Sequence, residues 1–325
     1  MSSTDKSVLT CVVGIHCDSE IPGDGIQVPW LTGSTIYLTN RTERIRSLVS
    51  SIPDEALGDL LRSRFLDSRM ILCGSLEDLP DDTRLMRFLF LSLYPGLLTG
   101  LWLQKDNAAS CADTVVYTRS QADDTVERAV YTGGRDVFLS AQGRANDTAF
   151  TPAELKSALS SPCLVPIAIS LAKAVAMRHS SRPELNRLER LLQMLRHARC
   201  TQDPGLRTAM YMVCLEILFS TDAAELSHKL GERCALFVGN GPTARLDVYT
   251  LVKKAYGIRS KVFHGDVLKA SVSHTLGDTC VAMDALLRSV MRKVYSHNEN
   301  AGLFLEKGDV FEDYFLRLVM GMGEV

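Results

Sequence analysis

The sequence predicts an α+β chain of two domains, with a mixed α/β domain over residues 1–150 followed by an all-α helical bundle over residues 151–325. Three observations lead to this prediction. The length of 325 residues is about two domains' worth. Short apolar runs broken by Pro and Gly predominate in the front half, as is typical of strands and turns. From Pro152 onward the chain changes to long segments with helical periodicity and few turn signals.

The front half alternates strand and helix patterns. Apolar runs between residues 8 and 40 are separated by glycine turns and predict strands, whereas residues 41–69 carry leucines at helical spacing and predict one or two helices. The most apolar window, residues 88–103, is too short to span a membrane and contains Pro95, so we expect a buried strand or helix there. Further strands are predicted over residues 115–117, 129–131 and 137–139.

The rear half predicts a series of helices joined by short loops, which together form an antiparallel bundle. Pro183 and Pro204 lie where a first helical turn tolerates proline, and Thr221 with Glu225 predicts a capping box. Gly265 follows the fifth helix, where glycine is favoured. The predicted helices cover about residues 164–178, 184–199, 204–219, 222–238, 243–264 and 273–297, with a short one after them.

The formal net charge is −2, which excludes nucleic-acid binding driven by an overall positive charge. Residues 1–150 carry 14 basic and 20 acidic residues, whereas the remainder carries 22 and 18. The two halves therefore differ in sign, and any RNA site must be local. Residues 1–7 are polar and lack the features of a signal peptide, so we expect a cytoplasmic protein without membrane association.

Nothing in the sequence predicts a cofactor or a metal. The nine cysteines are odd in number and form no Cys-x-x-Cys pair, so we expect reduced thiols in the core. Cys11, His16 and Cys17 have no standard ligand spacing and lack a fourth ligand. The glycines at 239 and 241 are not followed by the Lys and Ser or Thr of a phosphate-binding loop, which disfavours a nucleotide-binding regulator.

The fifth predicted helix ends with Tyr256-x-x-Arg259-Ser260-x-x-x-His264-Gly265, and Leu215-Glu216 lies about 40 residues upstream. This pattern resembles the Arg-x-x-x-x-His signature of the HEPN superfamily, and most closely its Apea-like branch. The resemblance covers roughly residues 200–300 and extends to the helices from about residue 160. It implies an all-α HEPN bundle and a metal-independent ribonuclease, used as a toxin or in bacterial antiviral defence.

A second copy of the same spacing, Arg292 to His297, shows that the spacing alone is weakly specific. We favour the first copy because an aromatic residue precedes its Arg by three positions, a small polar residue follows the Arg, and Gly265 follows its His. Arg259 also falls on a stripe of Tyr249, Val252, Tyr256 and Phe263, where a guanidinium requires a partner.

The chemistry of RNA cleavage suits these residue types. Attack of a 2′-hydroxyl on its own phosphate requires a base, an acid and a cation beside the phosphorane. We expect His264 to transfer protons and Arg259 to hold the phosphate, with Lys261 adding charge and Ser260 binding the phosphate or orienting the histidine. Glu216 is expected to be a structural partner of Arg259 rather than an acid or base.

Two alternatives for function remain open. If Arg259 pairs with Glu216 while His264 only caps the helix, the HEPN fold is catalytically silent and binds RNA or a partner protein. If the site is active, Arg259 and His264 lie about 140° apart around an ideal helix, so they are not a simple intrahelical pair. The resemblance implies a homodimer in which two motifs face each other across a symmetric cleft.

The front domain contains no catalytic set, and we expect it to sense an unknown trigger or to restrain the ribonuclease. The alternative is that it selects the RNA, either by stacking on Trp30 or Trp102 or through the arginine cluster at positions 41, 44 and 46.

Overall fold

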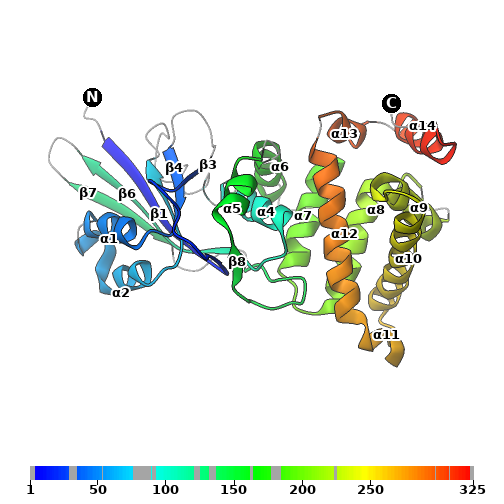
Figure 1. The fold of residues 1–325 in the computed structure, drawn as a ribbon, viewed down its shortest axis with the longest axis horizontal. Helices are drawn as coiled ribbons and strands as arrows, with labels where there is room; N and C mark the ends of the chain where they lie inside the picture. Colours follow the sequence, from blue (N-terminus) through cyan, green and yellow to red (C-terminus); the bar gives the residue numbers. More distant parts are fainter. Residues whose placement is uncertain are drawn as a thin grey trace. The chain divides into compact units, whose positions relative to one another are not determined.

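The computed structural model divides into two compact units (Figure 1). The first comprises Met1–Phe138 and Ala145–Ala172, and the second comprises Leu139–Arg144 and Lys173–Val325. The predicted α+β architecture is confirmed. The structure describes residues 4–28, 35–52, 54–75, 89, 93–120, 125–131, 137–161, 164–176, 184–222, 225–296, 298–306 and 308–322.

The first unit is built on an antiparallel sheet with the strand order β3-β4-β5-β1-β6-β7. The predicted strands at residues 115–117 and 129–131 lie in β6 and β7. The predicted strand at residues 137–139 is wrong, because the chain leaves the sheet there and the N–H of Leu139 donates to the carbonyl of Arg199 at 2.9 Å. The strands are β1 (Thr4–Val13), β3 (Ile26–Val28), β4 (Thr35–Thr39), β5 (Ile71–Ser75), β6 (Ser110–Ser120) and β7 (Val126–Tyr131).

Helices cover both faces of this sheet, since alternate residues of each strand point to opposite sides. Leu9 of β1 belongs to the core beneath α1 (Thr42–Ser50) and α2 (Asp54–Leu66). Its neighbour Val8 belongs to the opposite core, with α4 (Tyr94–Gln104). The apolar window predicted as a buried strand or helix therefore contains a buried helix, α4, whose residues 94–103 are all buried.

The border between the units differs from the predicted border at residue 150. Helix α5 (Pro152–Leu159) and the start of α6 (Leu164–Ala176) belong to the first unit. Leu155 and Ala168 explain this, because they pack into the same core as the sheet. Residues before the predicted border, Leu139–Arg144, belong instead to the second unit.

A small parallel pair joins distant parts of the first unit. Strand β2 (Ile15–Cys17) pairs with β8 (Thr148–Phe150), with His16 opposite Ala149. Gly14 precedes β2 with φ of 78°, and a Cβ at this position would lie 2.2 Å from the carbonyl oxygen of Ala108. A side chain at position 14 is thus excluded by both conformation and space.

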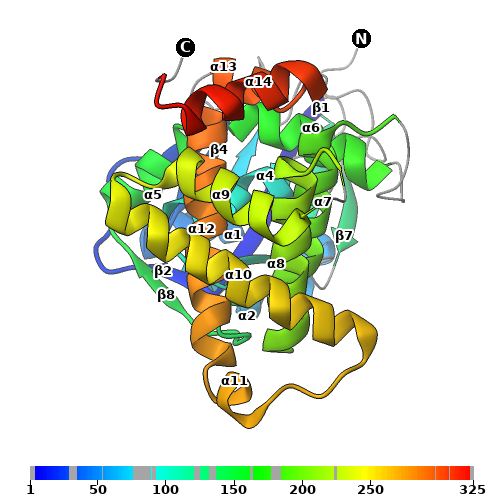
Figure 2. The same cartoon turned by 90° about the vertical axis from the view of Figure 1, so that its right-hand side faces the viewer.

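The second unit is helical, and α8 is its central helix, packed against α7, α9, α10 and α12. Figure 2 shows α10 crossing the face turned to the viewer, in front of α8. The predicted sixth helix is divided at Thr275 into α11 and α12. The helices are α7 (Arg187–Arg199), α8 (Pro204–Phe219), α9 (Leu226–Val238), α10 (Pro242–His264), α11 (Ala270–His274), α12 (Leu276–Ser296), α13 (Asn298–Leu303) and α14 (Gly308–Val319).

The predicted capping box of the fourth helix is wrong. Helix α9 begins at Leu226, and Glu225 before it has a left-handed backbone with φ of 48° and makes no side-chain cap. The Thr221 hydroxyl instead hydrogen-bonds to Glu312 of α14. The Thr221 side chain therefore bonds to a residue distant in the sequence instead of capping the helix. Helix α7 does begin with a capping box, formed by Asn186 and Glu189.

Arg207 of α8 is fully buried and ties the segment 139–144 to the helical unit. Its guanidinium donates to the main-chain carbonyl oxygens of Ser140, Arg199 and Thr201. Because each of these carbonyl groups is desolvated, loss of the donor leaves several polar groups without a partner.

We predict that Arg207→Met lowers the free energy of unfolding of the helical unit by about 3 kcal/mol, since several buried carbonyl groups lose their donor. Denaturant unfolding followed by circular dichroism measures the change. Arg317→Met is the matched control, because the Arg317 side chain is 44% exposed and its ion-pair partner among the described residues is Asp313, one turn away. The control should change stability by about 0.5 kcal/mol or less. Equal effects would contradict the role given to Arg207.

Candidate functional site

Helix α10 carries the candidate motif and ends at its histidine, as predicted. Gly265 follows with a left-handed backbone, φ 75°, and the N–H of Asp266 donates to the carbonyl oxygen of Lys261 at 2.9 Å. This glycine cap makes His264 the last helical residue.

Arg259 turns toward α8 and forms an ion pair with Glu216. Its Nη2 lies 3.0 Å from Oε2 of Glu216, and the two side chains are 26% and 15% exposed. The guanidinium carbon also lies 5.8 Å from the ring centre of Tyr256 and 5.4 Å from that of Phe263, within the range of cation–π attraction. The structure thus contains the ion pair on which the catalytically silent alternative depends.

This ion pair is incompletely satisfied. Oε1 of Glu216 and Nε of Arg259 are both buried, and neither has a hydrogen-bond partner among the described residues. Burial raises the pKa of Glu216 above its ordinary value, and the opposing effect of Arg259 is smaller. Desolvation of the carboxylate therefore outweighs its attraction to the guanidinium.

His264 lies on another side of α10 and is exposed. A separation of five residues places it about 140° around the helix from Arg259 and about 7.5 Å along the axis. Among the described residues, no side chain hydrogen-bonds to its ring. Ser260 and Lys261 are half-buried. The structure therefore brings Arg259 and Glu216 together but does not bring His264 to them within one chain.

The buried side of α10 differs from the predicted aromatic stripe. The buried residues are Val252, Ala255 and Ile258, whereas Phe263 is 48% exposed and Tyr256 is half-buried. The aromatic rings lie at the border of the packed face, where they flank Arg259. The outer face is basic, because Lys253, Lys254, Lys261 and His264 lie on it and α10 contains no acidic residue after Asp247.

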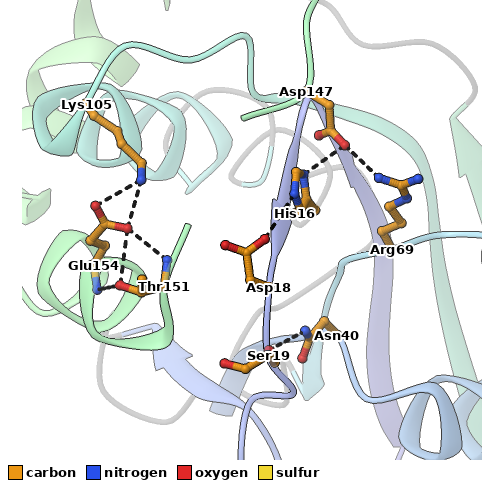
Figure 3. Close-up of polar contacts among 9 residues, drawn as sticks. All are labelled: His16, Asp18, Ser19, Asn40, Arg69, Lys105, Asp147, Thr151 and Glu154. Carbon is orange, nitrogen blue, oxygen red and sulfur yellow. Dashed lines mark hydrogen bonds and ion pairs between the residues drawn. The ribbon is translucent and has the colours of Figure 1, made fainter. Parts of the chain in front are cut away.

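The structure also contains a polar cluster around His16 in the first unit, which the sequence did not predict (Figure 3). Nδ1 of His16 lies 3.0 Å from Oδ2 of Asp147, and Nε2 of His16 lies 3.3 Å from Oδ1 of Asp18. Arg69 donates to the same oxygen of Asp147 at 2.9 Å. The pairing of β2 with β8 brings His16 and Asp147 together from 131 residues apart, so no local motif signals the contact.

Most of the described cysteines are buried free thiols, namely Cys11, Cys73, Cys111, Cys214, Cys234 and Cys280. Burial raises the pKa of the Cys11 and Cys73 thiols to about 11, which keeps them neutral near pH 7. The described residues contain no group of His, Cys, Asp or Glu side chains placed to hold a metal ion.

Trp102, Arg41 and Arg44, which are candidates for RNA selection, make contacts within the first unit. Trp102 is fully buried, so a base cannot stack on it, and the prediction for this residue is wrong. Trp30 lies outside the described residues. Arg41 donates to the carbonyl oxygen of Gly23 at 3.2 Å, and Arg44 lies 3.5 Å from a carboxylate oxygen of Asp24. These arginines hold a neighbouring loop of their own domain.

The second copy of the spacing cannot be compared as a pair, since Arg292 lies on α12 but His297 is outside the described residues. No family model, curated protein or solved structure matches the chain. Within the part of the chain that the structure describes, no single helix is long and apolar enough to cross a membrane, and only α5 and α6 together, bent by 59°, reach that length and hydrophobicity.

The raised pKa of Glu216 predicts a pH dependence of stability. A carboxyl group whose pKa is raised by folding contributes stability at acid pH and loses it as the pH rises through the raised value. Glu216→Gln cannot ionise, so its free energy of unfolding relative to wild type should increase between pH 4 and pH 7. Denaturant unfolding at the two pH values measures the difference.

Glu312 provides a control of opposite sign. Burial raises the pKa of Glu312, but hydrogen bonds from Thr221 and Arg233 outweigh this effect and lower it overall. Stability from this group is present above its unfolded pKa and is lost as the pH falls, so Glu312→Gln should lose stability relative to wild type as the pH rises. The same sign in both variants would contradict the assignment for Glu216.

Proposed function

We propose that the chain is a metal-independent endoribonuclease of the HEPN type, acting in antiviral defence or as a toxin. The observation that carries the proposal is the placement of His264, an exposed histidine at the carbonyl end of α10 on the side of the helix that also carries Lys253, Lys254 and Lys261. An RNA backbone is attracted to such a face, and a histidine there is accessible to the scissile phosphate.

The proposed reaction is attack of a 2′-hydroxyl on the adjacent phosphorus. The attacking oxygen loses its proton to a base, the 5′-oxygen leaves with a proton from an acid, and a 2′,3′-cyclic phosphate and a 5′-hydroxyl result. His264 transfers a proton in this scheme, and Arg259 stabilises the phosphorane with its remaining N–H groups. Lys261 adds positive charge, and Ser260 binds the phosphate or orients the histidine.

The divergence of Arg259 and His264 on α10 supports a two-fold dimer as the active unit. In one chain the two side chains point about 140° apart, so a single motif does not surround a phosphate. A second copy facing the first supplies the missing groups, because a two-fold interface presents each motif to its own equivalent.

A second candidate function is a silent HEPN module that binds RNA or a partner protein. The ion pair of Arg259 with Glu216 favours this candidate, because an arginine neutralised inside the bundle needs no substrate phosphate. An RNA cleavage assay distinguishes the two candidates, because the silent module binds RNA without cleaving it.

For the first unit we propose a sensing or regulatory role. It has a hydrophobic core of its own and sits mainly within the part of the chain that carries the acidic excess. A fragment that begins at residue 151 does not test this role cleanly, because it lacks the segment 139–144 that Arg207 binds.

We predict that His264→Ala reduces RNA cleavage at least about a hundredfold, the usual effect of losing a proton-transfer group. Arg259→Ala should do the same, tested together with Glu216→Gln so that no buried carboxylate is left unpaired. Cleavage should persist in EDTA and leave 2′,3′-cyclic phosphate ends. His274→Ala and His297→Ala are the histidine controls and should cleave normally. Undiminished cleavage by the His264 variant would refute the proposal.

We predict a dimer of the 35.8 kDa chain in light scattering. Because the two copies share the reaction, mixing the His264→Ala and Arg259→Ala chains should restore cleavage that neither shows alone. A fully active monomer, or a mixture that stays inactive although heterodimers form, would contradict a site shared between copies.

A further inference from the structure

A groove of about 550 Å³ lies in the first unit, between the loop that leads into β3 and helix α5. Its volume is within the range of small-molecule sites in proteins. Ile21, Pro22 and Ile26 form one wall, and Pro152 and Ala153 form the other. Most of the surface is apolar, and nothing in the proposed ribonuclease reaction uses it.

The first wall is held in place by the side chains of Asn40 and Arg41, which lie between β4 and α1. The N–H of Ile21 donates to Oδ1 of Asn40 at 2.8 Å, and Nδ2 of Asn40 donates to the carbonyl oxygen of Ser19 at 2.9 Å (Figure 3). Arg41 donates to the carbonyl oxygen of Gly23 at 3.2 Å. These contacts fix the loop at several points, so the wall is formed before any ligand arrives.

The second wall is fixed by the first turn of α5. Thr151 and Glu154 form a capping box, and Nζ of Lys105 lies 2.9 Å and 2.8 Å from the two carboxylate oxygens of Glu154 (Figure 3). On the inner side of the helix, Leu155 is buried in the core beneath the sheet. Both walls therefore belong to ordered parts of one unit.

Among the described residues that line the groove, Lys156 is the charged one. It is exposed and, unlike Lys105, has no ion-pair partner among the described residues. Asp24 and Glu20 near the first wall are already engaged, at 3.5 Å from Arg44 and 3.7 Å from Arg41. The groove therefore offers an apolar surface with a single available positive charge.

We propose that this groove binds a small organic acid, with its carboxylate at Lys156 and its hydrocarbon body against Ile21, Ile26 and Pro152. Burial of the hydrocarbon supplies most of the affinity, and the lysine selects the acid over a neutral analogue. Through this site the first unit senses a small organic acid. The proposal does not depend on whether the second unit cleaves RNA.

The test is calorimetric titration of the full chain with 4-phenylbutyrate and octanoate, each compared with the corresponding alcohol. The acids should bind about threefold more tightly than the alcohols, as expected for one exposed ion pair. Lys156→Gln should remove the preference, and Lys156→Arg should restore it. Ala153→Trp fills the groove from an exposed position and should weaken both classes of probe at least tenfold.

Thermal melting of each variant shows whether it is folded before titration. Equal affinity of wild type for acids and alcohols would mean adventitious apolar binding and would overturn the proposal. The same conclusion follows if Ala153→Trp binds the probes as wild type does, or if neither acid binds at millimolar concentration. None of these results depends on ribonuclease activity, so the two proposals fail separately.

Discussion

The packing of the second unit depends on the burial of α8, because burial removes the polar side chains of this helix from water. Helices on several sides cover α8, so each polar side chain on it requires a partner inside the bundle. Arg207 satisfies three main-chain carbonyl groups, and the hydroxyl of Tyr211 donates to Asp284 of α12 at 2.8 Å. Glu216 pairs with Arg259 of α10. These contacts fix which face of each neighbouring helix meets α8.

The polar side chains of α8 differ in how completely they are hydrogen-bonded, and the incompletely bonded pair belongs to the candidate site. Arg207 is fully buried, whereas Arg259 and Glu216 are partly exposed, and one polar atom of each has no hydrogen-bond partner among the described residues. In the proposed complex, a phosphate oxygen would have to compete with the Glu216 carboxylate for the guanidinium of Arg259.

The chain passes between its units more than once, and this limits how they can be separated. Residues 139–144 belong to the helical unit, and residues 145–172 return to the first. Each passage is held by contacts within a unit, such as Ser140 with Arg207 in the second and His16 with Asp147 in the first. Any cut near residue 150 therefore removes residues that one of the two cores needs.

Local chemistry in the sequence determined much of the secondary structure. Gly265 ends α10 because glycine adopts a left-handed backbone easily, and Asp203 with Pro204 starts α8. The helical periodicity from Thr243 onward likewise predicted the helix that carries His264. The sequence also predicted that Glu216 is the partner of Arg259, and the ion pair is present. The tertiary structure alone decided that Thr221 bonds to Glu312 instead of capping α9, that His264 is exposed, and that Asn40 shapes the groove wall. The physical reason is that caps and turns depend on neighbours within a few residues, whereas these partners are brought together only by packing.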